Sequence, residues 1–441
     1  MGEFTNQRAL AMAFLVAHLI PSLATIAHAS WPQFRGPDGQ GHAPNSHAPL
    51  NWSETENIRW KVAVPGRGWS SPVVSADQVW LSTAIEGHSL RAICIDRLNG
   101  RLVHNVELFR AEDDIPIHAH NSRATPTPVL DADHVFFHFG TFGTACLSSD
   151  GRRIWTNSTL HYNQPHGPAS SPIVHGNLLI LNCDGTDVQF VAALDKRTGD
   201  VVWKRPRQHL EGARAKAKAE PADREGFPLM AYSTPLVIEV DGRHQLVSTA
   251  ADHVAAYDPA TGEEIWWCAY DGFSVVARPV YRDNRLFVVG FEQQSVPVLY
   301  AIRPNQAGEV TLDDLAWRRE RGVSFVPSPL LVGNELYMIE DAGVAICLDA
   351  ATGQQNWQER IGGNFSASPV AVYNHIYLLS QDGKATVLEA GTQFRQLATN
   401  QLGGHFRASP AVVGNALYLR SETHLYCIEA TNEPSPIGDD S

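Results

Sequence analysis

The chain has 441 residues, 44% of them hydrophobic, and a formal net charge of -13 at pH 7. That length and apolar content are enough for a large folded core. The acidic balance argues against nucleic acid as a partner, because affinity for a phosphate backbone needs Lys and Arg clustered on one face.

The first 29 residues differ in composition from the rest of the chain. An apolar stretch over residues 9–26 is followed by Ala27-His28-Ala29, a small-x-small cleavage pattern. An uncleaved membrane anchor is the main alternative, because Arg8 is the only basic residue ahead of the stretch. We predict a signal peptide over residues 1–29 and an exported protein, periplasmic or extracellular, with no transmembrane segment after cleavage.

A repeat runs through most of the remaining sequence. Eight times a Ser, Thr or Arg directly precedes a Pro at the start of an apolar run, at intervals of 40 to 63 residues, which is the period of a propeller blade. These eight anchors are Ser71-Pro72, Thr127-Pro128, Ser171-Pro172, Thr234-Pro235, Arg278-Pro279, Ser328-Pro329, Ser368-Pro369 and Ser409-Pro410.

The sixth repeat shows the strands of one unit most clearly. Its runs cover residues 328–332, 335–339, 344–349 and 354–360, and turns that contain Gly separate them. Short runs bounded by turn formers are typical of strands in antiparallel hairpins. Each repeat is therefore predicted to form one four-stranded blade.

A second motif, Asp-x-x-Thr-Gly-x-x-x-Trp, follows the anchors. Its best copies cover residues 195–203, 258–266 and 349–357, and His104 takes the Trp position in the first repeat. A Trp ring on an outer strand can wedge between neighbouring blades while its N–H donates to a carbonyl. We interpret these Trp residues as structural.

No Trp follows the eighth anchor, whereas residues 57–62, around Trp60, precede the first anchor without a blade of their own. We predict that this N-terminal strand completes the last blade, which closes the ring and removes exposed sheet edges. The predicted fold is all-β, a monomeric eight-bladed β-propeller over residues 57–430. Residues 30–56 should form an irregular segment whose residues 31–50 pack across the base of the ring, and residues 431–441 a disordered tail.

The six cysteines follow the register of the repeat. Cys94, Cys347 and Cys427 lie two positions before the acidic residue that ends their strand, a site that Ala occupies in three other repeats. A position shared by Cys and Ala is a small buried packing site, and thiols in separate blades are too far apart to bridge. We predict free, buried cysteines.

The repeat, with Asp, Thr-Gly and Trp in that order, resembles the tryptophan-docking repeat of the pyrroloquinoline quinone (PQQ) propeller superfamily. That superfamily includes the eight-bladed quinoprotein alcohol dehydrogenases and the non-enzymatic outer-membrane assembly propeller BamB. The phrases WPQFRGP (residues 31–37), NSRATPTP (residues 121–128) and GGNFSASP (residues 362–369) are similar to exported PQQ-like propeller proteins of planctomycete-type bacteria. The resemblance covers residues 31–430 and implies the scaffold, which enzymes and non-enzymes share.

The sequence departs from the dehydrogenases of this superfamily. They carry an adjacent Cys-Cys pair that packs on the quinone, and no two cysteines are neighbours in this chain. The resemblance also implies an acidic catalytic base and a Ca²⁺ held by carboxylate and amide oxygens, but no local motif assigns these roles to particular positions. We therefore assign no cofactor, no metal ligand and no catalytic residue, and PQQ with calcium belongs to the alternative of a dehydrogenase.

Segments that cross from one blade to the next line one mouth of a propeller channel, and function concentrates on such loops. Aromatic, imidazole, amide and guanidinium groups just before the anchors can hold an anionic, planar or peptide-like ligand there. A polar, water-filled mouth is the alternative. The predicted binding residues are Arg67, Trp69, Asn121, Arg123, His166, Tyr232, Asn364, Phe365, His405 and Arg407.

Other chemistries have weaker patterns. His118-x-His120 offers two imidazoles to a metal, but no third ligand is identifiable nearby, and solvated loop histidines are the alternative. The chain has no G-x-S-x-G or H-E-x-x-H motif, and no identifiable carboxylate pair for a lyase or hydrolase that acts on polysaccharide.

A rigid ring holds several loops in fixed positions relative to one another. The binding free energies of several modest contacts can therefore add without a further entropy cost for ordering the loops. We therefore predict a non-enzymatic binding or scaffolding module for a protein, a peptide or a cell-envelope component. The alternative, from a different class, is a PQQ-dependent oxidoreductase, a quinoprotein-type dehydrogenase that acts on an alcohol or a sugar.

Overall fold

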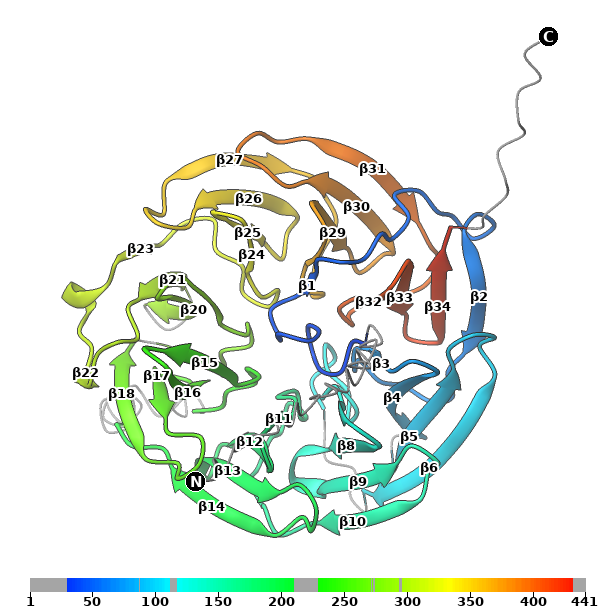
Figure 1. Cartoon of the computed structure of the whole chain (residues 1–441), viewed down its shortest axis with the longest axis horizontal. Coiled ribbons are helices and arrows are strands. Elements are labelled where there is room, and N and C mark those ends of the chain that lie inside the picture. The colour runs from blue at the N-terminus through cyan, green and yellow to red at the C-terminus, as the bar shows by residue number, and fades with distance from the viewer. Residues whose placement is uncertain are drawn as a thin grey trace, which may run out of the picture.

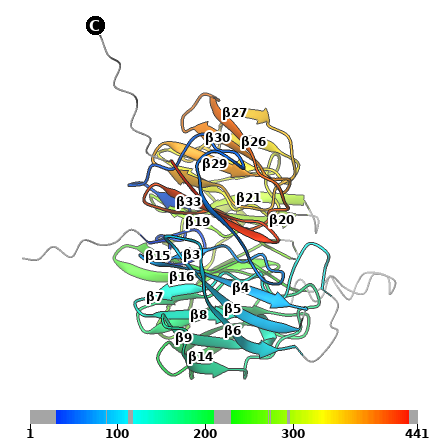
Figure 2. The same cartoon turned by 90° about the vertical axis from the view of Figure 1, so that its right-hand side faces the viewer.

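The computed structural model describes residues 30–86, 88–111, 117–209, 229–270, 272, 274–292 and 296–430. The predicted signal peptide and C-terminal tail lie outside these residues. Eight sheets, each built on four antiparallel strands, stand in a ring around a central axis (Figure 1), and Figure 2 shows the same ring from its side. Two short 3-10 turns, η1 (Gly140–Phe142) and η2 (Leu312–Asp314), interrupt the loops. The predicted eight-bladed propeller is confirmed.

The first four blades follow one another along the chain, each with its strands in order from the axis outward (Figure 1). The first contains β3 (Val73–Val74), β4 (Gln78–Ile85), β5 (Ser89–Asp96) and β6 (Leu102–Arg110). The second contains β7 (Val129–Asp131), β8 (His134–His138), β9 (Thr144–Ser148) and β10 (Arg153–Asn157). The third contains β11 (Ile173–His175), β12 (Leu178–Asp184), β13 (Gln189–Asp195) and β14 (Val201–Pro206). The fourth contains β15 (Leu236–Val240), β16 (Arg243–Thr249), β17 (His253–Tyr257) and β18 (Glu264–Ala269), with the short β22 (Gly308–Glu309) parallel to β18 at its outer edge.

The remaining blades repeat the same order. The fifth contains β19 (Val280–Arg282), β20 (Arg285–Glu292), β21 (Val296–Ile302) and β23 (Trp317–Arg319). The sixth contains β24 (Leu330–Val332), β25 (Glu335–Ile339), β26 (Val344–Asp349) and β27 (Gln355–Arg360). The seventh contains β28 (Val370–Val372), β29 (His375–Leu379), β30 (Lys384–Glu389) and β31 (Gln396–Gln401). The eighth contains β32 (Ala411–Val413), β33 (Ala416–Arg420), β34 (His424–Glu429) and, from the other end of the chain, β2 (Ile58–Ala63).

Ring closure is made by β2. This strand pairs antiparallel with β34, with Trp60 opposite Cys427 and Lys61 opposite Tyr426. Arg59 forms an ion pair with Glu429 beside them. Because β2 occupies the outer edge of the eighth blade, β34 is paired on both of its sides, as the third strand of every other blade is. The predicted closure of the last blade by the strand around Trp60 is confirmed.

The Trp residues of the repeat fasten each blade to the next. The indole N–H donates to a backbone carbonyl of the following blade at 3.0 to 3.2 Å in Trp60, Trp155, Trp203, Trp317 and Trp357. The motif Gly of the following blade allows this approach, because a Cβ on Gly199 would lie 2.5 Å from the Trp155 ring. His104 packs in the same way on Gly151, which confirms that it occupies the Trp position.

The hydroxyls of the anchors form a ring of hydrogen bonds around the axis, which we call the hydroxyl ring. Its members are Ser71, Thr127, Ser171, Thr234, Ser328, Ser368 and Ser409. Each hydroxyl accepts the backbone N–H of the preceding anchor at 2.9 to 3.0 Å. The ring is interrupted once, where Arg278 replaces the hydroxyl and its guanidinium instead donates to the carbonyls of Phe34 and Pro235.

Residues 31–50, here called the base segment, cross the ring opposite the mouth that carries the crossover loops (Figure 1). Trp31 pairs with Val74 of the first blade, and Arg35 donates to the carbonyl of Pro329 in the sixth. The strand β1 (His42–Ala43) then runs parallel to β28 of the seventh blade. The base segment therefore connects blades on opposite sides of the axis.

The hydrophobic core lies between adjacent blades. For example, Ile180 and Trp203 of the third blade pack with Ala255 and Tyr257 of the fourth. All six cysteines are buried and free within these layers, as the repeat register predicts. Among the residues that the structure describes, no helix has the length and hydropathy needed to cross a bilayer.

Candidate functional site

A cavity of about 720 Å³ lies at the centre of the ring, a size within the usual range of small-ligand sites. The whole hydroxyl ring contributes to its wall, and Phe34 of the base segment also lines it. Because the base segment crosses the ring on that side, it closes the channel below the cavity. A ligand therefore reaches the cavity from the opposite mouth, between the crossover loops.

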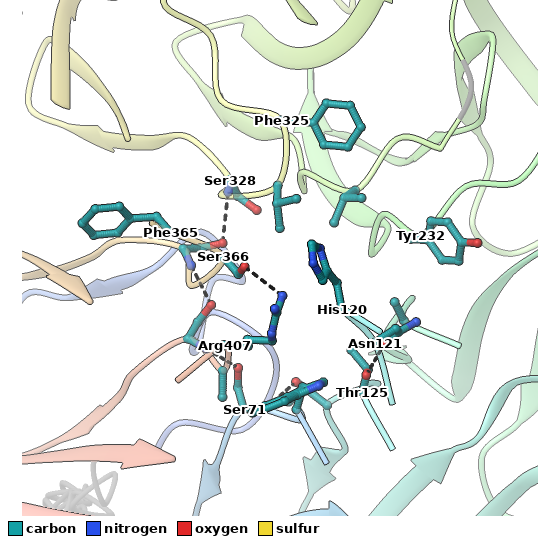
Figure 3. Close-up of a pocket in the computed structure, with 18 of the residues that line it drawn as sticks. Ser71, His120, Asn121, Thr125, Tyr232, Phe325, Ser328, Phe365, Ser366 and Arg407 are labelled. Atoms are coloured by element: carbon teal, nitrogen blue, oxygen red, sulfur yellow. Dashed lines mark hydrogen bonds between the residues drawn. The ribbon is translucent and has the colours of Figure 1, made fainter. Parts of the chain in front are cut away.

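The structure brings most of the predicted binding residues to this cavity. The wall includes Trp69, Asn121, His166, Tyr232, Asn364, Phe365 and Arg407. Figure 3 shows Asn121, Tyr232, Phe365 and Arg407 arriving from different blades, with Arg407 directed into the cavity and the Phe365 ring directed away from it. Their role in binding stays a prediction, but one cavity holds them together.

Three predicted residues lie outside the wall. The half-exposed side chain of Arg67 forms an ion pair with Glu422 at 2.9 Å. Arg123 is buried, with its Cζ 5.6 Å from the ring centre of Phe142. His405 packs edge-on against the Trp69 ring, 5.6 Å between ring centres. These side chains support the loops of the mouth rather than face the cavity.

At one corner of the cavity, Trp69 lies beside Arg407, the only Lys or Arg among the described residues of the cavity wall. The guanidinium Cζ atoms of Arg407 and Arg67 both lie 5.7 Å from the centre of the Trp69 ring. Arg407 donates from Nε to His405 Nε2 at 3.2 Å and from Nη1 to Ser366 Oγ at 3.4 Å. Burial and the nearby Arg67 lower the pKa of Arg407, so this corner carries closely spaced positive charges.

Three histidines lie together next to this corner, with His120 nearest to Arg407. The His118 ring centre is 5.1 Å from that of His120 and 5.3 Å from that of His166. Burial, with Arg407, His118 and His405 adding to it, lowers the pKa of His120 below the usual 6.5. Burial, followed by His118, lowers the pKa of His166 in the same direction. The rings of His120 and His166 are therefore held toward the neutral form.

Asn121 has a structural function in the mouth. Its amide nitrogen donates to the carbonyl of His166 at 2.8 Å and to that of Gly167 at 3.1 Å. Its amide oxygen accepts the backbone N–H of Ser122 and the hydroxyl of Thr125. Because both ends of the amide are engaged, Asn121 ties two neighbouring crossover loops together and has little capacity left for a ligand.

The cavity offers a poor donor set for calcium. Asp341 is the only carboxylate among the described residues of its wall, and it accepts the backbone N–H groups of Phe325 and Val326. Ca²⁺ takes six to eight oxygen ligands, commonly including several carboxylates. Within the described residues no group of three or more His, Cys, Asp or Glu is arranged to hold a metal ion. His118 and His120 therefore have no third residue of these types placed to complete a metal site with them. The residues present do not fit the calcium that the dehydrogenase resemblance implies.

Sequence reasoning missed several residues of the wall. Phe34 belongs to the irregular base segment, whose path no periodic pattern reveals. Asp341 and Gln381 lie in turns between the second and third strands of their blades, which reach the same mouth as the crossover loops. The repeat register could have predicted that these turns line the cavity, because they occupy equivalent positions in the sixth and seventh blades.

The sequence matches a family model described as outer membrane protein assembly factor BamB over residues 50–164 and 187–433. No curated protein matches the sequence. Among solved structures, BamB from Moraxella catarrhalis is 14% identical with a TM-score of 0.58, over 84% of this chain and 99% of that one. A europium-containing methanol dehydrogenase is 10% identical with a TM-score of 0.67, over 89% and 90% of the two chains. The quinohemoprotein alcohol dehydrogenase from Comamonas testosteroni is 10% identical with a TM-score of 0.62, over 91% and 81%.

The three solved structures show the fold alone, because binding proteins and enzymes share this ring and the identities are low. The family model is more specific, since it covers most of the chain, from the strand that closes the ring to the last blade. With the Trp-fastened blades and the closure by β2, this match shows that the chain belongs to the family of outer membrane protein assembly factor BamB.

Proposed function

We propose that this protein is a non-enzymatic binding module that receives part of a protein or peptide partner in the mouth of its ring. The observation that carries the proposal is the central cavity, open between the crossover loops and closed by the base segment, with aromatic, amide and cationic side chains on its wall. Such a wall provides contact area and orienting donors together, as ligand sites require.

The alternative is a PQQ-dependent dehydrogenase, and the described residues of the wall include neither an adjacent Cys pair nor a set of carboxylates for calcium. The six cysteines are buried in the blades and none is adjacent to another in sequence. Asp341 is the only wall carboxylate in the described residues, and backbone N–H groups occupy its oxygens. A binding function needs neither component and is consistent with the side chains present.

The family supports a place in the cell envelope, since its description refers to assembly at the outer membrane. We therefore propose that the chain acts as an exported monomer, periplasmic or extracellular, with a protein or another envelope component as partner. The apolar residues 9–26 and the pattern at Ala27-His28-Ala29 support export.

Site-specific photo-crosslinking in the cells that produce the protein tests which face binds. A photoreactive amino acid replaces Asn364, an exposed residue of the cavity mouth. The matched control replaces Tyr373, which is 63% exposed and whose backbone N–H donates to the carbonyl of Ala43 in the base segment. We expect a defined adduct from position 364 and none from 373. Equal adducts from both, or none from 364, would contradict the proposal.

A titration with PQQ and Ca²⁺ tests the enzyme alternative separately. We expect no saturable change in quinone absorbance, no rise in Tm and no dye reduction with simple alcohols or sugars. Saturable binding together with dye reduction would replace the binding module by an oxidoreductase, whatever the crosslinking shows.

A further inference from the structure

Trp69 is a wall residue with an unused donor. Its side chain is 4% exposed, and its indole Nε1 is buried with no hydrogen-bond partner among the described residues. By contrast, the Trp residues that fasten the blades donate to carbonyls. An N–H that is removed from water without an acceptor costs free energy. Because this nitrogen is covered in the free protein, a small turn of the indole ring is needed for a ligand acceptor to reach it and remove that cost.

The charges next to Trp69 are unbalanced. Arg67 has Glu422 as its ion-pair partner. In the described part of the chain Arg407 forms no ion pair: its hydrogen bonds go to His405 and Ser366, and Glu422 acts on it only at longer range. Arg407 and His120 both point into the cavity (Figure 3). His118, His405 and Arg407 are the groups that face His120, and none is acidic. The electrostatic environment of this corner therefore favours the binding of an anion.

The shape of the cavity limits which anion fits. The base segment closes the channel, so an extended chain cannot pass through the ring and must end or turn inside it. A carboxylate has two acceptor oxygens, which can take a guanidinium and an indole N–H together. Val276, Val326 and Ala408 give the same wall apolar surface for an adjoining side chain.

We propose that the corner formed by Trp69, Arg407 and His120 binds the free carboxylate of a peptide C-terminus, with the last side chain against the apolar wall. This assignment rests on the proposed binding function and names the chemical group that the cavity recognises. Arg407 supplies the positive charge for one carboxylate oxygen, and the Trp69 N–H donates a hydrogen bond to the other. His120 adds a proton-dependent donor.

Paired peptide libraries test this assignment on the full mature chain. The probes are N-terminally labelled hexapeptides with three randomised last positions, made both as free acids and as C-terminal amides. Peptides retained by the protein are identified, and their Kd values are measured by fluorescence anisotropy. We expect the free acid to bind at least about tenfold more tightly than its amide, because a hydrogen bond to a charged group is of that size.

Substitutions locate the effect. Arg407→Gln should remove the preference for the acid, and Arg407→Lys should restore part of it. Trp69→Phe keeps an aromatic ring without the N–H and should weaken binding about tenfold. Arg197→Gln is the matched control, because Arg197 is 70% exposed in the β13–β14 turn, and it should leave the Kd unchanged.

Each other outcome overturns the assignment. If acid and amide bind equally, or if Arg407→Gln retains the preference, no carboxylate is recognised at this corner. If no peptide binds but citrate or PQQ alone binds with dependence on Arg407, the anion comes from a small molecule and not from a peptide. The crosslinking at position 364 tests the binding function independently, because it detects a bound partner whichever chemical group of that partner the cavity recognises.

Discussion

At the scale of single residues, the charges of the mouth predict a pH dependence of binding. In the free protein, burial and nearby cations hold the pKa of His120 below 6.5. A bound carboxylate favours the protonated ring and raises that pKa, so the complex takes up a proton as it forms. Affinity for a peptide with a free C-terminal carboxylate should therefore rise as the pH falls from 7.5 to 5.5. His120→Asn should flatten this profile, measured as Kd against pH by anisotropy.

The same histidines predict the opposite trend for folding. His120 and His166 have pKa values lowered by burial, so their unfolded forms bind protons more readily. Stability from these groups is present above the unfolded pKa of about 6.5 and is lost as the pH falls from that value through their lower folded pKa. A bound anion should offset part of that loss.

For the affinity prediction, the contradicting outcome is a peptide affinity that falls between pH 7.5 and 5.5, because His120 would then not face the carboxylate.

At the scale of elements, the hydroxyl ring couples each blade to its neighbour at the axis. Thr127 accepts the backbone N–H of Ser71 at 2.9 Å, and both residues are buried. Thr127→Val keeps the shape of the side chain but leaves that N–H without an acceptor. The expected cost is about 1–3 kcal/mol of unfolding free energy, measured by urea denaturation. Thr352→Val in the exposed motif turn of the sixth blade is the control and should cost less.

An unchanged midpoint for Thr127→Val would mean that another acceptor replaces the hydroxyl. The fifth blade shows that the fold tolerates one break in the hydroxyl ring, because Arg278 has no hydroxyl to accept the backbone N–H of Thr234. There the guanidinium joins Pro235 to Phe34 of the base segment. Burial lowers the pKa of Arg278 to about 9, so this connection carries an electrostatic cost that a hydroxyl would not.

Elements defined by local pattern were predictable, and those defined by distant partners were not. The sixth-blade strands follow from apolar runs and Gly turns, and the Trp positions follow from the motif. By contrast, β1 and β22 have two residues each, and they exist only because β28 and β18 offer an edge. Trp266 also departs from the motif, since its N–H donates to Gln245 of its own blade. The turn of the fifth blade that would receive it is replaced by an insertion.

At the scale of the whole molecule, the ring explains why the site was partly predictable. The anchor register fixes where crossover loops meet the axis, and this places Trp69 and Arg407 on one wall. It does not fix side-chain partners, so Glu422 engages Arg67 and His405 packs behind Trp69. The closed floor depends on the path of the base segment, which only the assembled ring determines.

Closure of the ring by β2 predicts that two N-terminal truncations behave differently. Removal of residues 1–50 deletes the base segment but leaves β2 paired with β34, so we expect a monomeric ring with an open base. Removal of residues 1–63 also deletes Trp60, whose burial alone contributes about 3–5 kcal/mol. It exposes the edge of β34, and an unpaired edge recruits other strands.

We therefore expect the longer deletion to self-associate in sedimentation velocity, with a lowered Tm, while the shorter one sediments as a monomer. Trp60→Ala in the full chain separates the two effects, because it removes the docked ring but keeps the strand: it should lower stability without self-association. If both truncations remained monomeric with similar Tm, β34 would be protected by something other than β2. The ring would then close through contacts between blade faces, and β2 would contribute only its buried Trp.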